Sequence, residues 1–247
     1  MKIGAQLYTV RDFTKDTEAF AQTLARIADI GYKYVQVSGT CAFEAEWLKA
    51  ELDKNGLICP LTHTAPDKIV NDTELVIAEH KIFGAEYVGI GWYDLLKNGS
   101  GKFVDTFLAS ARAVKAGGLS LSYHNHDFEF AKGESGKLFF DEIAESFSPD
   151  ELKFTLDTFW VQAGGADPIE WINKLKGRTP CVHLKDMSYG RKMAALGEGN
   201  MNFDGILDAC VGAGVDYAFV EQDDCNGEDP FDCLKTSLEF LKSRGFN

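Results

Sequence analysis

Short apolar runs alternate regularly along this sequence with longer stretches whose apolar residues have helical spacing. Eight runs rich in Val, Ile, Leu and Tyr predict strands, at residues 3–8, 34–37, 58–63, 87–91, 119–125, 153–157, 180–185 and 217–221. Each is followed by a stretch that predicts a helix, at 17–30, 44–55, 72–83, 101–116, 139–147, 168–175, 204–212 and 230–243. This order is typical of parallel strands joined by helical crossovers.

The eight strand–helix units predict an α/β fold, a closed (β/α)8 TIM barrel. Helix ends are marked by glycines at which a left-handed C-cap is expected, namely Gly31, Gly56, Gly84, Gly117 and Gly214. No linker or break in composition interrupts the chain, so we expect a single domain over residues 1–247. The alternative, an open doubly wound sheet, usually carries a glycine fingerprint after its first strand, and residues 7–11 contain none.

The charge balance restricts the partners. Lys and Arg number 25 against 38 Asp and Glu, a net charge of −13, which argues against nucleic acid and against an anionic membrane surface. The first residues do not resemble a signal peptide, no apolar run approaches roughly 18 residues, and the six cysteines form no C-x-x-C pair. We therefore expect a cytoplasmic protein with a small-molecule partner, and homo-oligomers stay open.

Histidines gather where a barrel of this kind carries its chemistry, at the C-terminal ends of the strands. Four of the five histidines lie at predicted strand ends: His63, His124, His126 and His183. Any one of them, taken alone, has an ordinary structural explanation as a hydrogen-bonded residue. Their joint placement indicates a functional site.

Four residues from successive strands, which adjoin in a barrel, suggest a metal site: His124, Asp157, His183 and Glu221. Imidazole together with carboxylate suits Mn²⁺, Zn²⁺, Co²⁺ or Fe²⁺ better than Ca²⁺ or Mg²⁺ alone. Singly, Asp157 is explained as a cap of the following turn and Glu221 as a partner of Lys185. In register at one barrel mouth, the four residues predict a metal centre.

Six segments distributed over nearly the whole chain resemble the xylose-isomerase-like TIM-barrel superfamily. They read IGAQLYTVRD, SYHNHDFEF, LDTFW, VHLKD, LGEGNMNFDGIL and FVEQDD. That superfamily contains sugar isomerases and epimerases, inosose dehydratases and family-2 apurinic endonucleases. The resemblance implies one divalent metal ion, Mn²⁺ first and Zn²⁺, Co²⁺, Fe²⁺ or Mg²⁺ as alternatives, held by His124, Asp157, His183 and Glu221.

One departure from the family pattern affects the expected reaction. Many epimerases of this superfamily carry a glutamate at the strand-5 position, where it pairs with the strand-8 glutamate to move protons on opposite faces of the substrate. Here that position holds His124, unless the alignment slips so that Glu129 reaches the metal. With His124 as the ligand, a lyase, a dehydratase or a one-base isomerisation is favoured over an epimerisation that uses two glutamates. The endonuclease branch is set aside, because those enzymes use a three-zinc cluster and need a cationic surface.

The expected activity is that of a metal-dependent sugar isomerase or epimerase, acting on a keto-sugar or related polyol through an enediolate. The alternatives are β-elimination from an inosose or 3-keto-glycoside, an inactive sugar-binding barrel, and a subunit that needs a partner protein. We expect Glu221 to be the general base, Lys185 to donate to an oxyanion or a departing hydroxyl, and Glu129 to carry a proton. Residues expected to contact the substrate are His63, His126, Gln6, Trp92 and Trp160.

Overall fold

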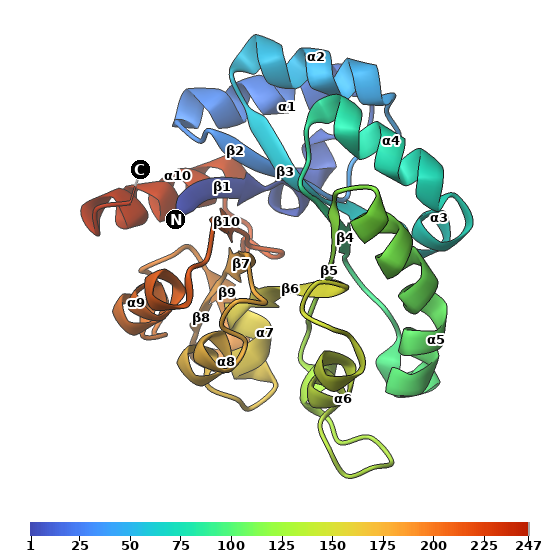
Figure 1. Ribbon diagram of the computed structural model, residues 1–247. Coiled ribbons are helices and arrows are strands. Elements are labelled where there is room, and N and C mark those ends of the chain that lie inside the picture. The colour runs from blue at the N-terminus through green and yellow to red at the C-terminus, as the bar shows by residue number, and fades with distance from the viewer. Residues whose placement is uncertain (247) are drawn as a thin grey trace.

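Eight parallel strands close into a barrel in a computed structural model that describes residues 1–246 (Figure 1). They are β1 (Lys2–Gln6), β2 (Tyr34–Val37), β3 (Ile58–Thr64), β4 (Tyr87–Ile90), β5 (Ser120–His124), β6 (Leu152–Asp157), β7 (Cys181–Leu184) and β10 (Tyr217–Val220). Strand β1 pairs with both β2 and β10, which closes the sheet. The predicted (β/α)8 barrel is confirmed and the open sheet is wrong. Asn247, the last position of the predicted domain, lies outside the described residues.

Helices surround the barrel and connect its strands. They are α1 (Thr17–Ile30), α2 (Ala45–Asn55), α3 (Pro66–Asn71), α4 (Thr73–Phe83), α5 (Leu95–Ala116), α6 (Phe139–Ser146), α7 (Thr158–Ala163), α8 (Pro168–Lys174), α9 (Phe203–Ala213) and α10 (Pro230–Ser243), with short 3₁₀ helices η1 (Leu7–Phe13), η2 (Phe128–Phe130) and η3 (Tyr189–Arg191). Helix α1 shows how the sequence forms them: Phe20, Leu24 and Ile27 share one buried face, and the Asp16 carboxylate caps the first turn. Among residues 1–246, no helix combines the length and apolar character that a membrane crossing requires.

Several element boundaries differ from the sequence prediction. The first strand ends at Gln6 rather than residue 8, because the Gln6 side chain accepts a hydrogen bond from the Tyr8 amide (2.7 Å) and turns the chain into η1. Helix α5 begins at Leu95, ahead of the predicted residue 101, with a break at Gly99 (φ +74°). The left-handed caps are confirmed except at Gly117, which is right-handed; Gly118 beside it takes the positive φ.

The barrel interior has an apolar floor and a polar top layer, because every second residue of each strand points inward. The floor, toward the N-terminal ends of the strands, is a separate buried cluster formed by Leu61, Tyr87, Cys181, Tyr217 and Phe219. Two residues beyond Cys181 on β7 comes His183, and two beyond Phe219 comes Glu221. The alternation therefore lifts polar side chains into the layer above the floor, at the mouth of the barrel.

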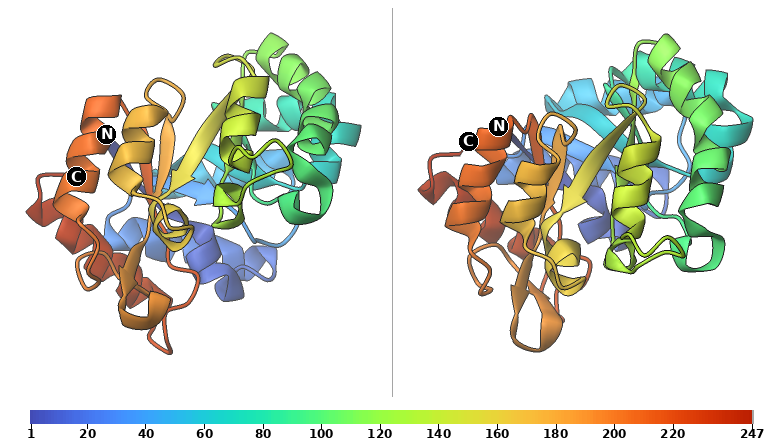
Figure 2. Two further views of the ribbon diagram at one scale, coloured as in Figure 1. Left: turned by 90° about the horizontal axis from the view of Figure 1, so that it is seen from below. Right: turned by 60° about the horizontal axis from the view of Figure 1, so that its bottom comes forward.

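An antiparallel hairpin that the sequence analysis missed follows β7 and projects beyond the barrel (Figure 2). It consists of β8 (Asp186–Ser188) and β9 (Lys192–Ala194), strands too short to show a periodic pattern. The Asp186 carboxylate anchors the chain that follows by accepting hydrogen bonds from the amides of Gly197 (3.0 Å), Gly199 (3.1 Å) and Met201 (3.3 Å). The hairpin thus leaves the barrel from a fixed base.

Candidate active site

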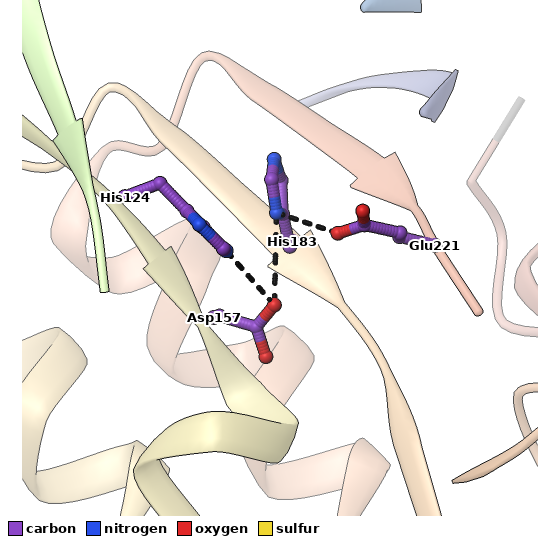
Figure 3. Close-up of side chains that lie close together, drawn as sticks. All are labelled: His124, Asp157, His183 and Glu221. Atoms are coloured by element: carbon purple, nitrogen blue, oxygen red, sulfur yellow. Dashed lines mark hydrogen bonds and ion pairs between the residues drawn. The ribbon is translucent and has the colours of Figure 1, made fainter. Parts of the chain in front are cut away.

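Four side chains from adjoining strands converge at the mouth of the barrel (Figure 3). His124 ends β5, Asp157 ends β6, His183 lies on β7 and Glu221 follows β10. One nitrogen or oxygen of each lies within 4.8 Å of the others, and all four residues are buried. The structure thus brings together the four residues named as metal ligands from the sequence; we call them the His–Asp–His–Glu group.

Asp157 and His183 lie at the centre of the group. The Asp157 Oδ2 atom lies 3.2 Å from His124 Nε2 and 3.6 Å from His183 Nδ1, and His183 Nδ1 lies 2.8 Å from Glu221 Oε2. The second oxygen of Asp157 accepts the Trp160 amide (3.0 Å), so the same carboxylate also caps α7. This double use holds the Asp157 side chain in place.

Gln36 of β2, a strand separated from β7 by β1 and β10, orients the His183 ring. Its Oε1 atom accepts a hydrogen bond from His183 Nε2 at 2.6 Å, which places a proton on that nitrogen and turns Nδ1 toward Asp157 and Glu221. Burial lowers the pKa of His183, but the neighbouring Glu221 and Asp157 carboxylates outweigh burial and raise it. Of the two imidazoles in the group, His183 is therefore the one that more readily takes up a second proton and becomes a cation.

The donor set of the group fits a divalent metal ion. Within residues 1–246, His183 Nδ1 and Glu221 Oε2 are buried and lie 2.8 Å apart, with Lys185 Nζ 2.9 Å from Glu221 Oε2, but neither atom makes a contact with the geometry of a hydrogen bond. A cation shared between them would satisfy both atoms, and a site with two imidazole and two carboxylate ligands suits Mn²⁺, Zn²⁺, Co²⁺ or Fe²⁺. The group can hold a metal ion.

Lys185 is a buried ammonium beside this group. Its Nζ atom lies 3.1 Å from Asp157 Oδ2, 2.9 Å from Glu221 Oε2 and 3.0 Å from Asp223 Oδ1. Burial lowers the pKa of Lys185, yet the three carboxylates raise it more, so the side chain stays protonated. In turn, burial raises the pKa of Glu221, but Lys185 and His183 outweigh it and lower that pKa, which keeps Glu221 ionised.

A cavity of about 530 Å³ opens above the group, within the size range of small-molecule sites. All five residues predicted to contact substrate line it: His63, His126, Gln6, Trp92 and Trp160. Lys185, His124 and Glu221 also face the cavity, whereas Asp157 and His183 are not among its lining residues. Burial lowers the pKa of His126 to about 3, so this imidazole is neutral and can both donate and accept hydrogen bonds.

Glu129 lies apart from the cavity. The 3₁₀ turn η2 carries it behind β5, where its buried carboxylate accepts hydrogen bonds from the Tyr123 hydroxyl and from the His126 amide (2.8 Å). Burial raises the pKa of Glu129 to about 7. Because Glu129 reaches neither the cavity nor the His–Asp–His–Glu group, the predicted proton-transfer role does not fit its position, and His124 is the β5 residue whose ring nitrogen lies in that group.

Sequence reasoning missed other residues that shape the site. Asp223 lines the cavity and pairs with Lys185, while Arg11 donates to the Asp223 carbonyl (3.0 Å) and lies over the Tyr8 ring. The period of two could have indicated Asp223, which follows Glu221 as Lys185 follows His183. No such signal marks Arg11, because η1 was expected to be partly strand.

Solved structures resemble this chain over nearly its whole length. One is a sugar phosphate isomerase/epimerase from Parabacteroides distasonis ATCC 8503, with a TM-score of 0.84 and 21% identity, covering 98% of this chain and 97% of that chain. Another is an L-ribulose 3-epimerase, with a TM-score of 0.76 and 18% identity, covering 98% and 94%. A third is the probable 3-DHS dehydratase AsbF from Bacillus anthracis, with a TM-score of 0.73 and 17% identity, covering 99% and 100%.

At these identities the likeness shows the fold alone, and it confirms the predicted structural resemblance to xylose-isomerase-like TIM barrels. No protein-family model matches the sequence, and no curated protein is a detectable relative.

Proposed function

We propose that this chain is a divalent-metal-dependent enzyme that isomerises or epimerises a keto-sugar through an enediolate. The observation that carries the proposal is the set of unsatisfied polar atoms around the cavity. Within the described residues, Gln6 Nε2, His63 Nε2, His126 Nδ1 and Trp160 Nε1 are buried without a hydrogen-bond partner, and all four residues line the cavity. A ligand with several hydroxyl groups would satisfy these atoms. The similar folds of an isomerase/epimerase and an L-ribulose 3-epimerase support the proposal.

The metal ion would be held by His124, Asp157, His183 and Glu221. Bound there, it supplies a Lewis acid that polarises a carbonyl oxygen and acidifies the adjacent C–H bond. Mn²⁺ is our first choice for this mixed nitrogen and oxygen donor set, followed by Zn²⁺, Co²⁺, Fe²⁺ and Mg²⁺.

Glu221 and Lys185 are suited to the proton transfers. Glu221 is an ionised carboxylate on the cavity wall, so it can take the proton from the carbon beside the carbonyl. The Lys185 ammonium, 2.9 Å from Glu221, can donate a hydrogen bond to the negative charge that develops on oxygen. The rings of Trp92 and Trp160 offer apolar faces for the C–H side of a sugar. In isomerisation, the protonated Glu221 then gives its proton to the neighbouring carbon of the enediolate; in epimerisation, a second group would protonate the original carbon from the opposite face.

Hydrogen exchange tests this proposal. The metal content of the purified protein is measured first, and a panel of keto-sugars is then incubated with it in D₂O and followed by NMR. The Glu221→Gln variant should slow exchange about 10²–10⁴-fold, because it removes the base and keeps the shape of the side chain. The exposed Glu198→Gln variant is the matched control and should exchange at the wild-type rate. Full exchange by Glu221→Gln would show that the base is a different residue.

A second candidate reaction, β-elimination, is favoured by where the carboxylates lie. Both carboxylates on the cavity wall, Glu221 and Asp223, follow β10, and the strands across the barrel contribute the imidazoles of His63 and His124. Epimerisation needs proton transfer on both faces of the substrate, whereas elimination needs one base and one acid. In the elimination, Glu221 takes the C–H proton, the electron pair expels the β-oxygen substituent, and Lys185 gives that oxygen its proton.

Lys185→Met separates the two reactions. If elimination is the reaction, this variant should still exchange substrate hydrogen with D₂O but release no leaving alcohol or water, as measured by NMR of the products. If isomerisation is the reaction, exchange and product formation should fall together. Lys33→Met, an exposed lysine that precedes β2, is the control that keeps both activities.

A further inference from the structure

A second hollow, of about 360 Å³, adjoins the cavity, and Trp160 lines both. Beyond Trp160, the two hollows meet at one contact: the amide of Asp223, which lines the cavity, donates to Met193 Sδ, which lines the second hollow (3.2 Å). Met193 belongs to the β8–β9 hairpin, so this hollow lies between the hairpin, α7 and the chain after β10. The two hollows are therefore neighbours that share Trp160 as a lining residue.

The backbone around this hollow is held in an uncommon conformation. Arg191 (φ +61°) and Asn226 (φ +53°) are the only non-glycine residues with positive φ among residues 1–246, and both line the hollow. Each is secured by its side chain: Arg191 Nη2 lies 3.2 Å from Asp127 Oδ2, and Asn226 Nδ2 donates to the Met193 carbonyl (2.8 Å). Glycine would adopt these angles without cost. Arg191 follows Gly190 in the turn between β8 and β9, where positive φ is normal, and asparagine tolerates this region, so the two turns hold these residues at the edge of the hollow.

The chemistry of the hollow suits an uncharged ring. Its apolar surface comes from Phe159, Trp160 and Met193, the kind of surface on which a sugar or aromatic ring packs. Its polar rim consists of Arg191, Lys192, Asp224 and Asn226, which can hydrogen-bond to hydroxyl groups. Arg191 is paired with Asp127, so the rim does not form a concentrated anion site.

We propose that this hollow is a subsite for the second unit of a keto-glycoside, whose keto-sugar ring occupies the 530 Å³ cavity. The inference rests on the proposed function and narrows its substrate class from free monosaccharides to glycosides. The glycosidic linkage would pass Trp160, beside Lys185, whose Nζ atom lies 5.7 Å from the Trp160 ring.

The test compares the binding of two probes to the metal-loaded protein by calorimetry: methyl 3-keto-β-glucoside, which fills only the first cavity, and 3-keto-cellobiose, which reaches both. We expect the disaccharide to bind at least about tenfold tighter, a difference of about 1.4 kcal/mol. Arg191→Gly and Asn226→Gly keep the positive φ and remove the side chains, and each should lower the affinity for the disaccharide while leaving that for the methyl glycoside unchanged. Asn98→Gly, on the distant start of α5, is the control for both probes.

Equal affinity for the two probes, including the absence of binding by either, would overturn the subsite. An equal loss for both probes in the glycine variants would overturn it as well. The proposed function can fail independently of the subsite. If the protein prefers the disaccharide but exchanges no substrate hydrogen with D₂O, the proposed reaction is wrong and the subsite stands. If the protein exchanges hydrogen of the methyl glycoside with D₂O but binds both probes equally, the subsite is wrong and the proposed reaction stands.

Discussion

At the scale of single residues, the site depends on side chains that hold other side chains. The Gln36 side chain contacts Nε2 of His183, which leaves Nδ1 of His183 to face the carboxylates of Asp157 and Glu221. Asn125 does similar work for Asp157, since its Oδ1 atom accepts the Asp157 amide (3.0 Å). These partners position the His–Asp–His–Glu group without belonging to it.

Gln36→Leu should weaken metal binding about 10–100-fold, because the His183 ring loses the partner that sets its orientation and its tautomer. The measurement is a calorimetric titration with Mn²⁺. Gln6→Leu is the matched control: Gln6 is also a buried glutamine at a strand end, but its side chain accepts from the Tyr8 amide. Equal metal affinity in the Gln36→Leu and Gln6→Leu variants would show that Gln36 does not orient His183.

Glu129 should make the protein less stable as the pH rises from about 4.5 to about 7. Burial raises its pKa in the folded state, so over this range the folded protein keeps a proton that the unfolded chain has lost. Above pH 7 both states are ionised, and the folded state bears the full cost, about 3 kcal/mol. Glu129→Gln should flatten the decrease in melting temperature over this range, and the exposed Glu134→Gln variant should not. Parallel pH profiles for wild type and Glu129→Gln would contradict this role.

At the scale of elements, glycines let neighbouring strands and side chains approach closely. A Cβ atom on Gly89 of β4 would lie 2.2 Å from the Thr62 carbonyl oxygen of β3, and one on Gly91 would lie 2.7 Å from His63 Nδ1. The two glycines therefore leave the space in which β3 packs and in which the His63 ring lies beside the His124 ring, with their centroids 5.2 Å apart. A side chain at either position would displace part of the site.

Gly89→Ala should destabilise the protein by about 1–3 kcal/mol, since neither backbone can move away without breaking the sheet. Gly101→Ala is the matched control, because an added Cβ there meets no atom within 4 Å. This change should be neutral or stabilise the protein by up to about 1 kcal/mol, through higher helix propensity. Urea unfolding measures both variants. A Gly89→Ala protein as stable as wild type would disprove the close contact between β3 and β4.

At the scale of the whole molecule, closure of the barrel concentrates charge above an apolar floor. The carboxylates of Asp157, Glu221 and Asp223 face one ammonium, Lys185, in the upper layer. Burial and the neighbouring Glu221 raise the pKa of Asp223 to about 7, so above that pH two negative charges remain, which one divalent cation would neutralise. Metal binding should therefore stabilise the folded barrel, because the unfolded chain does not hold these residues together.

Adding Mn²⁺ at about 100 times its dissociation constant should stabilise the protein by about 2.7 kcal/mol, or roughly 5–10 °C in melting temperature. A chelator should reverse the effect. Asp157→Ala and His183→Ala should each fold, lose most of the bound metal by elemental analysis, and lose the thermal shift. The exposed Asp208→Ala variant should keep both. Unchanged metal occupancy in both ligand variants would rule out the His–Asp–His–Glu group as the metal site.

Features that depend on local spacing could be predicted from the sequence. Apolar periodicity located the strands and helices, and the period of two along β7 and β10 placed His183, Lys185 and Glu221 on the inner side of the barrel. The order of the strands then made neighbours of four residues that are far apart along the chain. Both inferences follow from backbone geometry, which is the same in every strand and helix.

Which side chains contact one another and which point away depends on the folded arrangement of the whole chain. Glu129 follows β5 closely in sequence, yet the η2 turn carries its carboxylate behind the strand to Tyr123. The contacts of Lys185 with three carboxylates, and the hollow that Arg191 lines, arise where separate loops come together. Spacing along the chain cannot determine such contacts, because they depend on the closure of the barrel and on the paths of the loops between its strands.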